Sequence, residues 1–220
     1  MMDFQFEIVT RSIPALWAGI VVTVKIGFLS FCAASLIGFC VGVLRSKSRW
    51  LSLLFAPYVE IFRGTPLLIQ LFFIYYGLPT INITLSSFQA AIIGLGLNGG
   101  AYISEVVRGA LQSINSGQKE AAYALGLNWC QTLTHVIMPQ ALAVSIPPLM
   151  NIFSSLLKET SLVSVLAITE LTRVGQLIYT RSFRAFEIYL VIGFLYFIMT
   201  FTVAKISYYL ERRYAIPDRL

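Results

Sequence analysis

Apolar residues fill most of this chain in long blocks, and polar residues collect between the blocks. A bilayer crossing needs about 20 apolar residues in a helix, because the hydrocarbon core is roughly 30 Å thick. Five blocks reach this length, and they cover residues 16–44, 55–76, 88–107, 133–157 and 188–209. The pattern predicts an all-α integral membrane protein with five transmembrane helices in a single domain, residues 1–220.

One polar stretch, residues 115–132, stands out because it is rich in small side chains. Ser116 is placed to cap a short helix, since its hydroxyl could accept an orphan backbone N–H. Gly126 lies near the end of that helix, where a cap requires positive φ. A short helix outside the bilayer buries little surface of its own. The stretch therefore predicts either a docking surface for another protein or a plain linker.

Charge sets the expected orientation. The chain is 57% hydrophobic and 12% charged and carries a formal net charge of +6. The basic residues gather at block ends and form no continuous stripe, which disfavours nucleic-acid binding. With the first loop inside, nine Lys and Arg lie inside and five outside, while the other two of the sixteen fall within blocks. This predicts the N-terminus outside, the C-terminus inside and residues 115–132 in the cytoplasm.

The ends and the rare residues add little chemistry. The first block is too long for a signal peptide and lacks a small-residue cleavage site, so we expect it to stay in place. Cys32, Cys40 and Cys130 have no metal-like spacing, and we expect them to pack as small apolar residues without a disulfide. His135 is the only histidine and has no partner ligand nearby, so no metal site is predicted.

Ionisable residues inside spans are functional candidates by default, because they are costly there. Glu60 and Arg63 are three residues apart and could face each other on one helix. Gly64 and Pro66 follow, and proline removes a backbone N–H, so a kink is predicted here. The group is either a self-neutralising ion pair or a pore-side hinge near a gate.

The third block offers a second polar group. Glu105 and Arg108 repeat the same spacing. Asn98 precedes Glu105 by two helical turns, so both should share a face, and both are candidates for the solute path. Gly99 permits either close helix packing or close approach of the backbone to a solute.

The fourth block ends in a third polar group, which contains Lys158, Glu159, Thr160 and Ser161. A basic and an acidic group together suit the carboxylate and ammonium of an amino acid. The alternative is a self-neutralising pair at the outer boundary. Thr169 should then cap an outer amphipathic stretch, which is either a contact for a binding protein or an interfacial helix.

The stretch after residue 115 also carries a recognisable motif. It reads Glu120-Ala121-Ala122, then Gly126, then Val136-Ile137-Met138-Pro139. This motif resembles the EAA loop of ATP-binding-cassette importer permeases. Other segments resemble the polar amino-acid branch, of histidine, glutamine, arginine and cystine type. They are Phe62-Arg63-Gly64-Thr65-Pro66-Leu67, Gln70-Leu71, Ala101-Tyr102 with Glu105 and Arg108, and Lys158-Glu159-Thr160-Ser161-Leu162.

The resemblance, which extends from about Leu16 to Arg213, implies the type I importer permease fold. It further implies that the EAA helix is a coupling helix held in a cleft of a cytoplasmic ATPase. The residues so assigned are Gly117, Glu120, Ala121, Ala122, Leu125 and Gly126. A second permease subunit (the same chain or a relative) and an extracytoplasmic solute-binding protein complete the expected complex, in the bacterial inner membrane.

The chain itself should perform no chemistry and bind no cofactor. It has no Gly-x-x-x-x-Gly-Lys-Ser/Thr phosphate loop, so ATP and Mg²⁺ are expected on the partner ATPase. The rival functions are an ion-gradient-driven secondary transporter or a channel, although no inverted repeat is visible. An integral-membrane enzyme is a weaker rival, because it needs a clustered catalytic constellation. The sequence does not name the amino acid.

Overall fold

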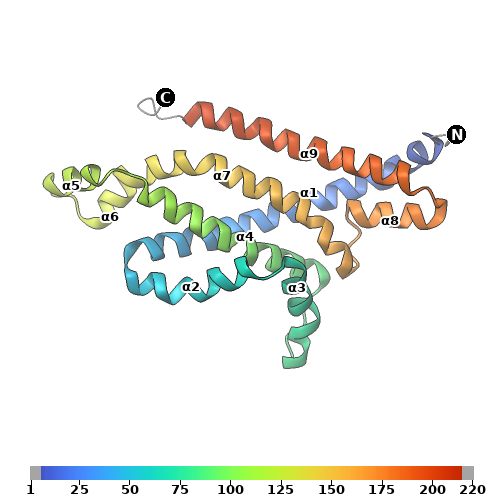
Figure 1. Ribbon diagram of the computed structural model, residues 1–220, viewed down its shortest axis with the longest axis horizontal. Helices are drawn as coiled ribbons and strands as arrows, with labels where there is room; N and C mark the ends of the chain where they lie inside the picture. The colour runs from blue at the N-terminus through green and yellow to red at the C-terminus, as the bar shows by residue number, and fades with distance from the viewer. Residues whose placement is uncertain (1–5, 215–220) are drawn as a thin grey trace.

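A computed structural model describes residues 6–214, and all regular elements in that part of the chain are helical. They form an elongated bundle, with α5 and α6 at one end and α8 at the other (Figure 1). The α-helices are α1 Phe6–Lys47, α2 Arg49–Gly64, α3 Leu67–Phe72, α4 Ser87–Gln112, α5 Ser116–Ala124, α6 Trp129–Gln131, α7 Met138–Glu159, α8 Leu171–Ser182 and α9 Ala185–Tyr214. Four π or 3-10 segments join them: η1 Phe73–Gly77, η2 Leu78–Ile81, η3 Thr132–Ile137 and η4 Thr160–Leu166.

Length and composition qualify four helices as membrane spans. These are Glu7–Lys47, Ser87–Gln112, Trp129–Leu166 and Ala185–Tyr214. A fifth span exists if Arg49–Gly64 and Leu67–Ile81 count together, although they meet at a bend of 107°. The apolar block 55–76 is therefore two helices and not one straight span.

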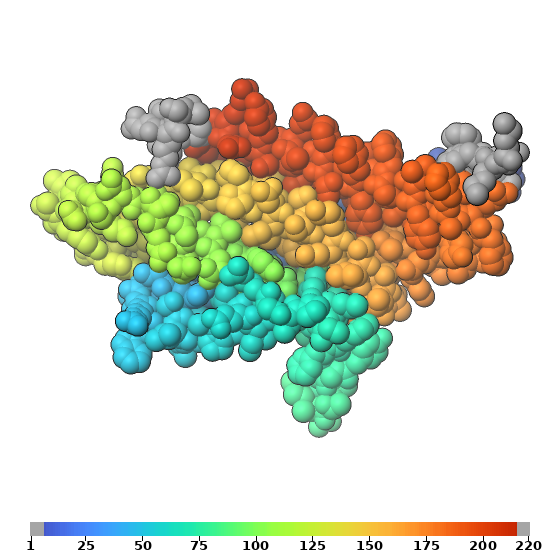
Figure 2. All heavy atoms as spheres, in the orientation of Figure 1, coloured from blue at the N-terminus to red at the C-terminus, as the bar shows by residue number. Residues whose placement is uncertain are grey.

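The bend arises where the sequence predicts a kink. Thr65 ends α2 with φ −114° and ψ 147°, which is extended backbone, and Pro66 precedes α3. Proline disfavours the helical conformation in the residue before it and supplies no N–H. We refer to residues 61–70 as the elbow. Beyond the elbow, the segment of α3, η1 and η2 projects from the body of the molecule (Figure 2).

Helix α4 forms the centre of the bundle and packs along α1, with α2 and α7 on its other sides. Small residues permit this close approach. A Cβ atom on Gly99 would lie 3.0 Å from Cβ of Ala34 and 3.3 Å from Cδ1 of Leu156. Of the two predicted uses of Gly99, the structure shows the close helix packing.

A second, smaller cluster joins the start of α1 to α8 and α9. Its buried members are Leu16, Leu171, Val174, Ile188 and Ile192. Helix α9 lies on the opposite side of the bundle from α2 (Figure 1). It exposes large apolar side chains such as Phe194, Phe197 and Phe201, which suits contact with lipid.

The cysteines were expected to pack as small apolar residues without a disulfide, but all three are exposed. Cys32 and Cys40 lie on an exposed face of α1, and Cys130 is exposed on α6. The face of α1 that meets α4 carries other small residues, such as Ala34 and Gly38, so the cysteines point away from it. All three thiols are free.

Candidate functional site

Helix α5 is shaped at both ends by short local contacts. Asn115, and not Ser116 as predicted, is the N-cap, since its side chain accepts a hydrogen bond from the backbone N–H of Gly117 at 2.9 Å. Gly126 follows the helix with φ +80°, as predicted for its C-terminal cap. The N–H of Leu127 then bonds to the carbonyl of Ala122 at 3.1 Å. This reversal directs the chain toward α6.

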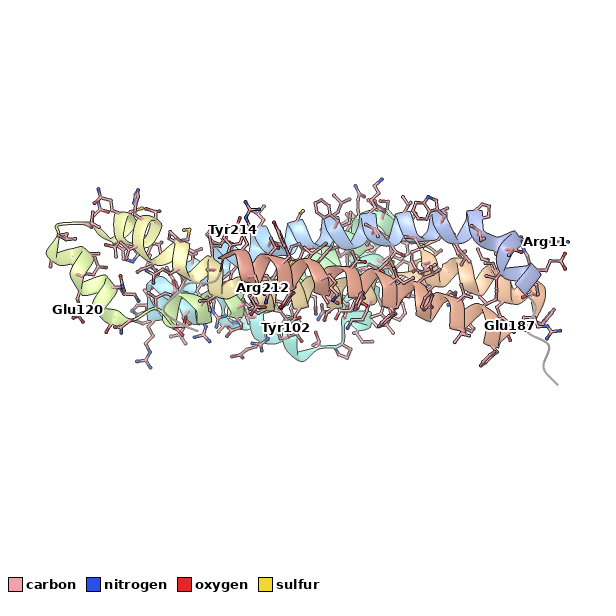
Figure 3. The ribbon with its side chains drawn as sticks, turned by 90° about the horizontal axis from the view of Figure 1, so that it is seen from above. Arg11, Tyr102, Glu120, Glu187, Arg212 and Tyr214 are labelled. Carbon is pink, nitrogen blue, oxygen red and sulfur yellow. The ribbon has the colours of Figure 1, made fainter. Side chains whose placement is uncertain are left out.

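Most of α5 is exposed, and it lies at the opposite end of the bundle from α8. Figure 3 shows Glu120 at one end of the molecule and Arg11 with Glu187 at the other. Leu125 is 82% exposed, whereas Ala122 is buried. Since α5 packs against η3, it has one covered side and one open side of small residues. An exposed leucine beside alanines is an apolar surface that no other residue between 6 and 214 covers.

A cation–π contact links this end of the bundle to α1. Nζ of Lys47, the last residue of α1, lies 4.9 Å from the ring centroid of Trp129 on α6. Such contacts contribute about 0.5–1 kcal/mol at exposed sites. Segment η3 continues directly into α7, so a displacement of α5 and α6 bears on both α1 and α7.

Gln70 stabilises the elbow. Its Nε2 donates to the carbonyl oxygen of Phe62 at 2.9 Å, and to the carbonyl and hydroxyl oxygens of Thr65 at 3.0 and 2.8 Å. The break in the helix leaves these carbonyls without helical partners, and a buried unpaired carbonyl is costly. The glutamine amide replaces the lost backbone donors.

Asn98 on α4 completes this network. Its Nδ2 donates to the carbonyl of Phe62 at 2.8 Å and to Oε1 of Gln70 at 3.1 Å, and the residue is buried. Tyr58 forms a parallel link, since its hydroxyl donates to the carbonyl of Leu97 at 2.7 Å. Asn98 is thus engaged in joining α4 to the elbow.

Glu105 is the centre of an arginine cluster. It forms an ion pair with Nη1 of Arg45 from α1, and a second at 2.7 Å with Nη2 of Arg108. Arg63 from α2 approaches to 4.0 Å. Arg63 also stacks on Tyr102, with 5.2 Å between the guanidinium carbon and the ring centroid. One carboxylate therefore joins three helices.

Of the two alternatives for Glu60 and Arg63, the structure does not show the ion pair. Among residues 6–214 Glu60 forms no ion pair, and Arg63 turns instead toward Glu105. The spacing of three residues allowed the local pair, but α4 presents a carboxylate that already holds two other arginines. Glu105 and Arg108, which have the same spacing, do form an ion pair. Asn98 and Glu105 both contact the end of α2, as their shared face predicts.

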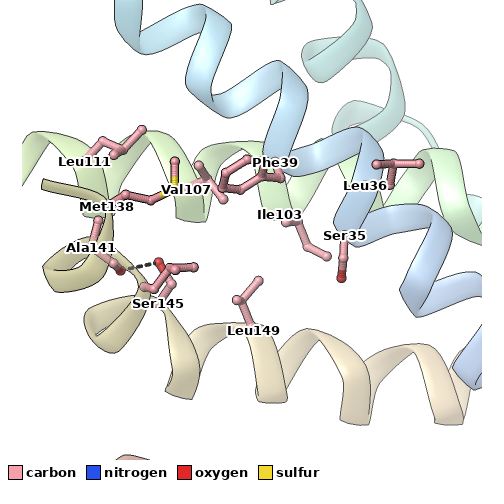
Figure 4. Close-up of a pocket in the computed structure, with 11 residues that line it drawn as sticks. Ser35, Leu36, Phe39, Ile103, Val107, Leu111, Met138, Ala141, Ser145 and Leu149 are labelled. Carbon is pink, nitrogen blue, oxygen red and sulfur yellow. Dashed lines mark hydrogen bonds between the residues drawn. The ribbon is translucent and has the colours of Figure 1, made fainter. Parts of the chain in front are cut away.

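A large cavity of about 430 Å³ lies between α1, α4 and α7 (Figure 4). Its lining is almost wholly apolar, and Oγ of Ser145 donates to the carbonyl of Ala141 within its own helix. None of the predicted solute-path residues lines it. A zwitterion needs convergent polar partners, so this cavity suits an apolar group and not an amino acid.

The predicted group at the end of α7 is partly covered. Thr160 is buried and its hydroxyl donates to the carbonyl of Leu157, Glu159 and Ser161 are half-buried, and Lys158 is exposed. Lys158 and Glu159 form no direct ion pair with each other. The adjacent Leu156 touches the Gly99 position, so this end of α7 lies beside the middle of α4.

A buried carboxylate caps α8. Glu170, and not Thr169 as predicted, is the N-cap, since its side chain accepts from the N–H groups of Thr172 and Arg173, each at 2.8 Å. The hydroxyl of Tyr196 on α9 donates to the same carboxylate at 2.9 Å. Burial raises the pKa of Glu170 above its ordinary value, although these hydrogen bonds oppose the shift.

Among the described residues, His135 has only local partners. Its Nδ1 lies 3.1 Å from the carbonyl oxygen of Gln131 and 2.9 Å from Oγ1 of Thr134. Within residues 6–214, no three His, Cys, Asp or Glu side chains come close enough to hold a metal ion.

Sequence reasoning missed several of these residues. Gln70 carried a usable signal, because a polar residue one turn after a proline break is well placed to bond freed carbonyls. Arg45 was read only as a boundary charge. Glu170 and Tyr196 gave no local signal, since 26 residues separate them and only the packing of α9 brings them together.

Comparison with known proteins agrees with this architecture. The family described as the binding-protein-dependent transport system inner membrane component matches residues 34–216. The chain is 43% identical over 202 residues to the L-cystine transport system permease protein TcyB of Bacillus subtilis (strain 168), covering 91% of this chain and 86% of that protein. It is 38% identical over 218 residues to the glutamine transport system permease protein GlnP of Escherichia coli (strain K12), covering 98% and 100%.

Solved structures show the same fold. An amino acid ABC transporter crystallised with histidines matches with a TM-score of 0.89 and 35% identity, covering 97% of this chain and 99% of that one. The inward-facing MetNI methionine ABC transporter matches with a TM-score of 0.84 at 23% identity, covering 94% and 99%, which speaks for the fold alone. The chain therefore belongs to the family of binding-protein-dependent transport system inner membrane components, and it is a permease subunit with the type I ABC importer fold.

Proposed function

We propose that this permease subunit imports a polar amino acid or a similar small zwitterion, driven by a separate cytoplasmic ATPase. The observation that carries the proposal is α5, a short exposed helix of small residues at one end of an otherwise apolar bundle. Its motif residues Glu120, Ala121 and Gly126 lie at or beside the open surface. The substrate class is supported by relatives named for L-cystine and glutamine transport.

The ATPase is proposed to hold α5 and move it. The coupling residues are Gly117, Glu120, Ala121, Ala122, Leu125 and Gly126. Small side chains allow the two backbones to approach closely, and Leu125 offers an exposed apolar side chain to a cleft. Movement then passes through η3 into α7 and through Trp129 to Lys47 at the end of α1.

The proposed orientation places α5 in the cytoplasm, with the N-terminus outside and the C-terminus inside, in the bacterial inner membrane. The distribution of Lys and Arg supports it. Arg212 and Arg213 near the end of α9 then lie on the cytoplasmic side with Arg45 and Lys47 of α1. A fluorescent-protein fusion to the C-terminus is expected to fluoresce, because that reporter folds inside the cell.

The solute path is proposed to follow α4 and the end of α7. Its candidates are Asn98, Gly99, Glu105, Lys158, Glu159, Thr160 and Ser161. Arg63, Gly64 and Pro66 form the proposed hinge, and the 107° bend gives that role a physical basis. Since Asn98 and Glu105 are bonded to the elbow, a solute would reach them only as the elbow moves.

The complete importer is proposed to contain two permease subunits, either two copies of this chain or this chain with a relative. Two ATPase subunits would bind below, with ATP and Mg²⁺ on those subunits. An extracytoplasmic solute-binding protein would deliver the amino acid. This chain is proposed to contribute no catalytic residue and no cofactor site of its own.

Uptake into proteoliposomes tests the function. The chain is reconstituted with its ATPase and binding protein, and uptake of labelled L-cystine and L-glutamine is measured with and without ATP. Uptake of either amino acid that requires ATP and both partners supports the proposal. Uptake driven by an ion gradient, without the ATPase, would instead establish a secondary transporter and reject the importer.

A further inference from the structure

The arginine cluster carries more positive charge than the described residues neutralise. Three guanidinium groups, of Arg45, Arg63 and Arg108, surround the single carboxylate of Glu105, so the cluster keeps two positive charges. Gln112 adds only a neutral acceptor, at 3.0 Å from Nη1 of Arg108. A surplus of this kind attracts an anion.

Hydrogen-bond donors also exceed acceptors in the cluster. Each guanidinium has five N–H groups and no acceptor, whereas a carboxylate offers about four acceptor sites. Nε of Arg45 and Nε of Arg108 are buried and have no partner among the described residues. The side chain of Arg45 is only 10% exposed. Buried unpaired donors are rare and call for a missing partner.

The cluster opens to the surface at Arg63. Its side chain is 43% exposed, and it rests on Tyr102, which is 41% exposed. A stacked guanidinium keeps its N–H edge free for a further ligand, and its fork matches the oxygens of a phosphate. An anion can therefore approach the cluster from this side.

The cluster lies at the level of a membrane boundary. Arg45 is in the last turn of α1, which ends at Lys47. Figure 3 shows Tyr102 close to the level of Arg212, in the basic last turn of α9, along the length of the molecule. In the proposed orientation this is the inner leaflet, where acidic lipids give a negative surface potential.

An apolar cavity of about 490 Å³ is lined by Ile61, Phe62 and Thr65, which flank Arg63 at the end of α2. Along α4 it is lined by Leu97 and then Ile93, which lie progressively further from Tyr102 and from the boundary. Its polar lining residues, Thr65 and Gln70, already bond within the elbow. The cavity thus points toward the bilayer interior, where an acyl chain would follow a head group.

We infer that the arginine cluster and the elbow cavity together bind one acidic phospholipid of the inner leaflet. The phosphate contacts Arg63 and Arg108, and one acyl chain lies against Ile61, Ile69, Ile93 and Leu97. The side of the membrane rests on the orientation given under the proposed function. The bound lipid joins α2 to α4 across the elbow, so it stabilises the bent state.

Lipid retention by the purified complex tests this inference. The full chain with its ATPase is placed in nanodiscs of phosphatidylethanolamine with increasing phosphatidylglycerol, and bound lipid is counted by native mass spectrometry. Arg63→Gln is expected to weaken phosphatidylglycerol retention about fivefold, because a charge near an acidic surface contributes roughly 1 kcal/mol. Phosphatidylethanolamine retention should fall much less, because its ammonium group offsets the charge of its phosphate. Arg11→Gln, which removes an exposed arginine at the other end of the bundle, is the matched control.

Two further variants test separately the binding of the lipid head group and the binding of its acyl chain. Tyr102→Leu keeps every ion pair of Glu105 but removes the stacking surface of Arg63, and Ile93→Trp fills the cavity without changing charge. Both variants should reduce phosphatidylglycerol retention. They still test the inference if Arg63→Gln misfolds. Equal retention in these variants and in Arg11→Gln would overturn the inference.

Two other results would replace the lipid by another occupant. Displacement of phosphatidylglycerol by millimolar inorganic phosphate would assign the cluster to a free phosphate. Loss of the permease pair in Ile93→Trp, with unchanged lipid retention, would assign the cavity to a second subunit. Lipid retention needs no transport, so its failure is distinct from a failure of amino-acid uptake by the wild type.

Discussion

Asn98 on α4 donates a hydrogen bond of 2.8 Å to the carbonyl oxygen of Phe62, 36 residues earlier at the end of α2. The bond reaches a carbonyl that the broken helix leaves without a backbone partner, and Gln70 reaches the same oxygen at 2.9 Å. Asn98, which the sequence suggests as a solute contact, therefore also holds α4 against the elbow. Any effect of its substitution on transport has to be separated from an effect on the elbow.

Asn98→Ala should destabilise the protein as well as slow uptake. The variant removes one buried and one partly buried hydrogen bond, which costs about 2 kcal/mol, or roughly 4–8 °C in Tm for a chain of this size. Thermal unfolding in detergent measures the change, with Thr180→Ala, which loses an exposed hydroxyl, as the control. An unchanged Tm with reduced uptake would show that Asn98 acts on the solute and not on the elbow.

The sequence was sufficient for the helices and insufficient for the contacts between them. The length of each apolar block and the helix-breaking residues Gly64 and Pro66 act locally. They therefore predicted the helical blocks and the position of the kink. The direction of a kink depends on packing that local sequence does not contain. For that reason the spacing allowed a pair of Arg63 with Glu60 on its own helix, whereas the packing brings Arg63 to Glu105 on α4.

The two wrongly predicted N-caps have the same cause, because packing that the local sequence does not contain decides which residue caps the helix. Ser116 and Thr169 were each one residue away from the true caps, Asn115 and Glu170. Serine and asparagine cap about equally well, so propensity does not decide between Ser116 and Asn115, and it favours Thr169 over Glu170. Glu170 is chosen because Tyr196 holds its carboxylate in place from α9.

Glu105→Gln should cost much more stability than the loss of an ordinary surface ion pair. Removal of the shared carboxylate leaves three arginines close together with no counter-charge, and unpairing a largely buried charge costs about 3–5 kcal/mol, less here because Glu105 is 21% exposed. The matched control is Glu7→Gln, whose pair with Arg11 is mostly exposed and contributes about 0–1 kcal/mol.

A double-mutant cycle with Arg108→Gln sharpens this prediction. If the network is the cause, the double variant should be more stable than the sum of the two single losses predicts, because it removes one unpaired charge. Additive losses would contradict a shared network. Thermal unfolding of all three variants at one salt concentration provides the measurement.

The buried cap of α8 should make stability depend on pH. Burial raises the pKa of Glu170 in the folded protein above its ordinary value of 4.5, so the folded state binds this proton more tightly than the unfolded state does. The resulting stabilisation is fully present below pH 4.5 and is lost as the pH rises through the raised pKa. Wild-type Tm should therefore fall over that interval.

Glu170→Gln isolates this contribution. The amide oxygen still accepts hydrogen bonds at the helix N-terminus but does not titrate, so the decline in Tm above pH 4.5 should be smaller in the variant. Glu120→Gln, a change at an exposed carboxylate on α5, should leave the decline as in the wild type. Parallel pH profiles for Glu170→Gln and the wild type would show that the carboxylate of Glu170 does not cause the decline.

The turn after α5 offers the sharpest test of coupling. Gly126 has φ +80°, and a Cβ at this position would meet no atom within 4 Å, so only backbone conformation restricts the residue. A β-branched side chain in this region is strained by about 1–2 kcal/mol or more, whereas asparagine tolerates it. Gly126→Val should thus redirect the chain after α5, lower ATPase co-purification and abolish ATP-driven uptake. Gly126→Asn should keep most of both.

A charged side chain at residue 126 distinguishes an effect of backbone shape from an effect of charge at the ATPase surface. Gly126→Asp has nearly the shape of Gly126→Asn, so a loss of coupling confined to Asp would place an ATPase surface directly against residue 126. Gly109→Ala, at a helical glycine that is equally free of neighbours, controls for the substitution itself and should couple normally. If Gly126→Val copurifies with the ATPase and supports full uptake, the turn plays no part in coupling, and the exposed face of α5 alone must account for it.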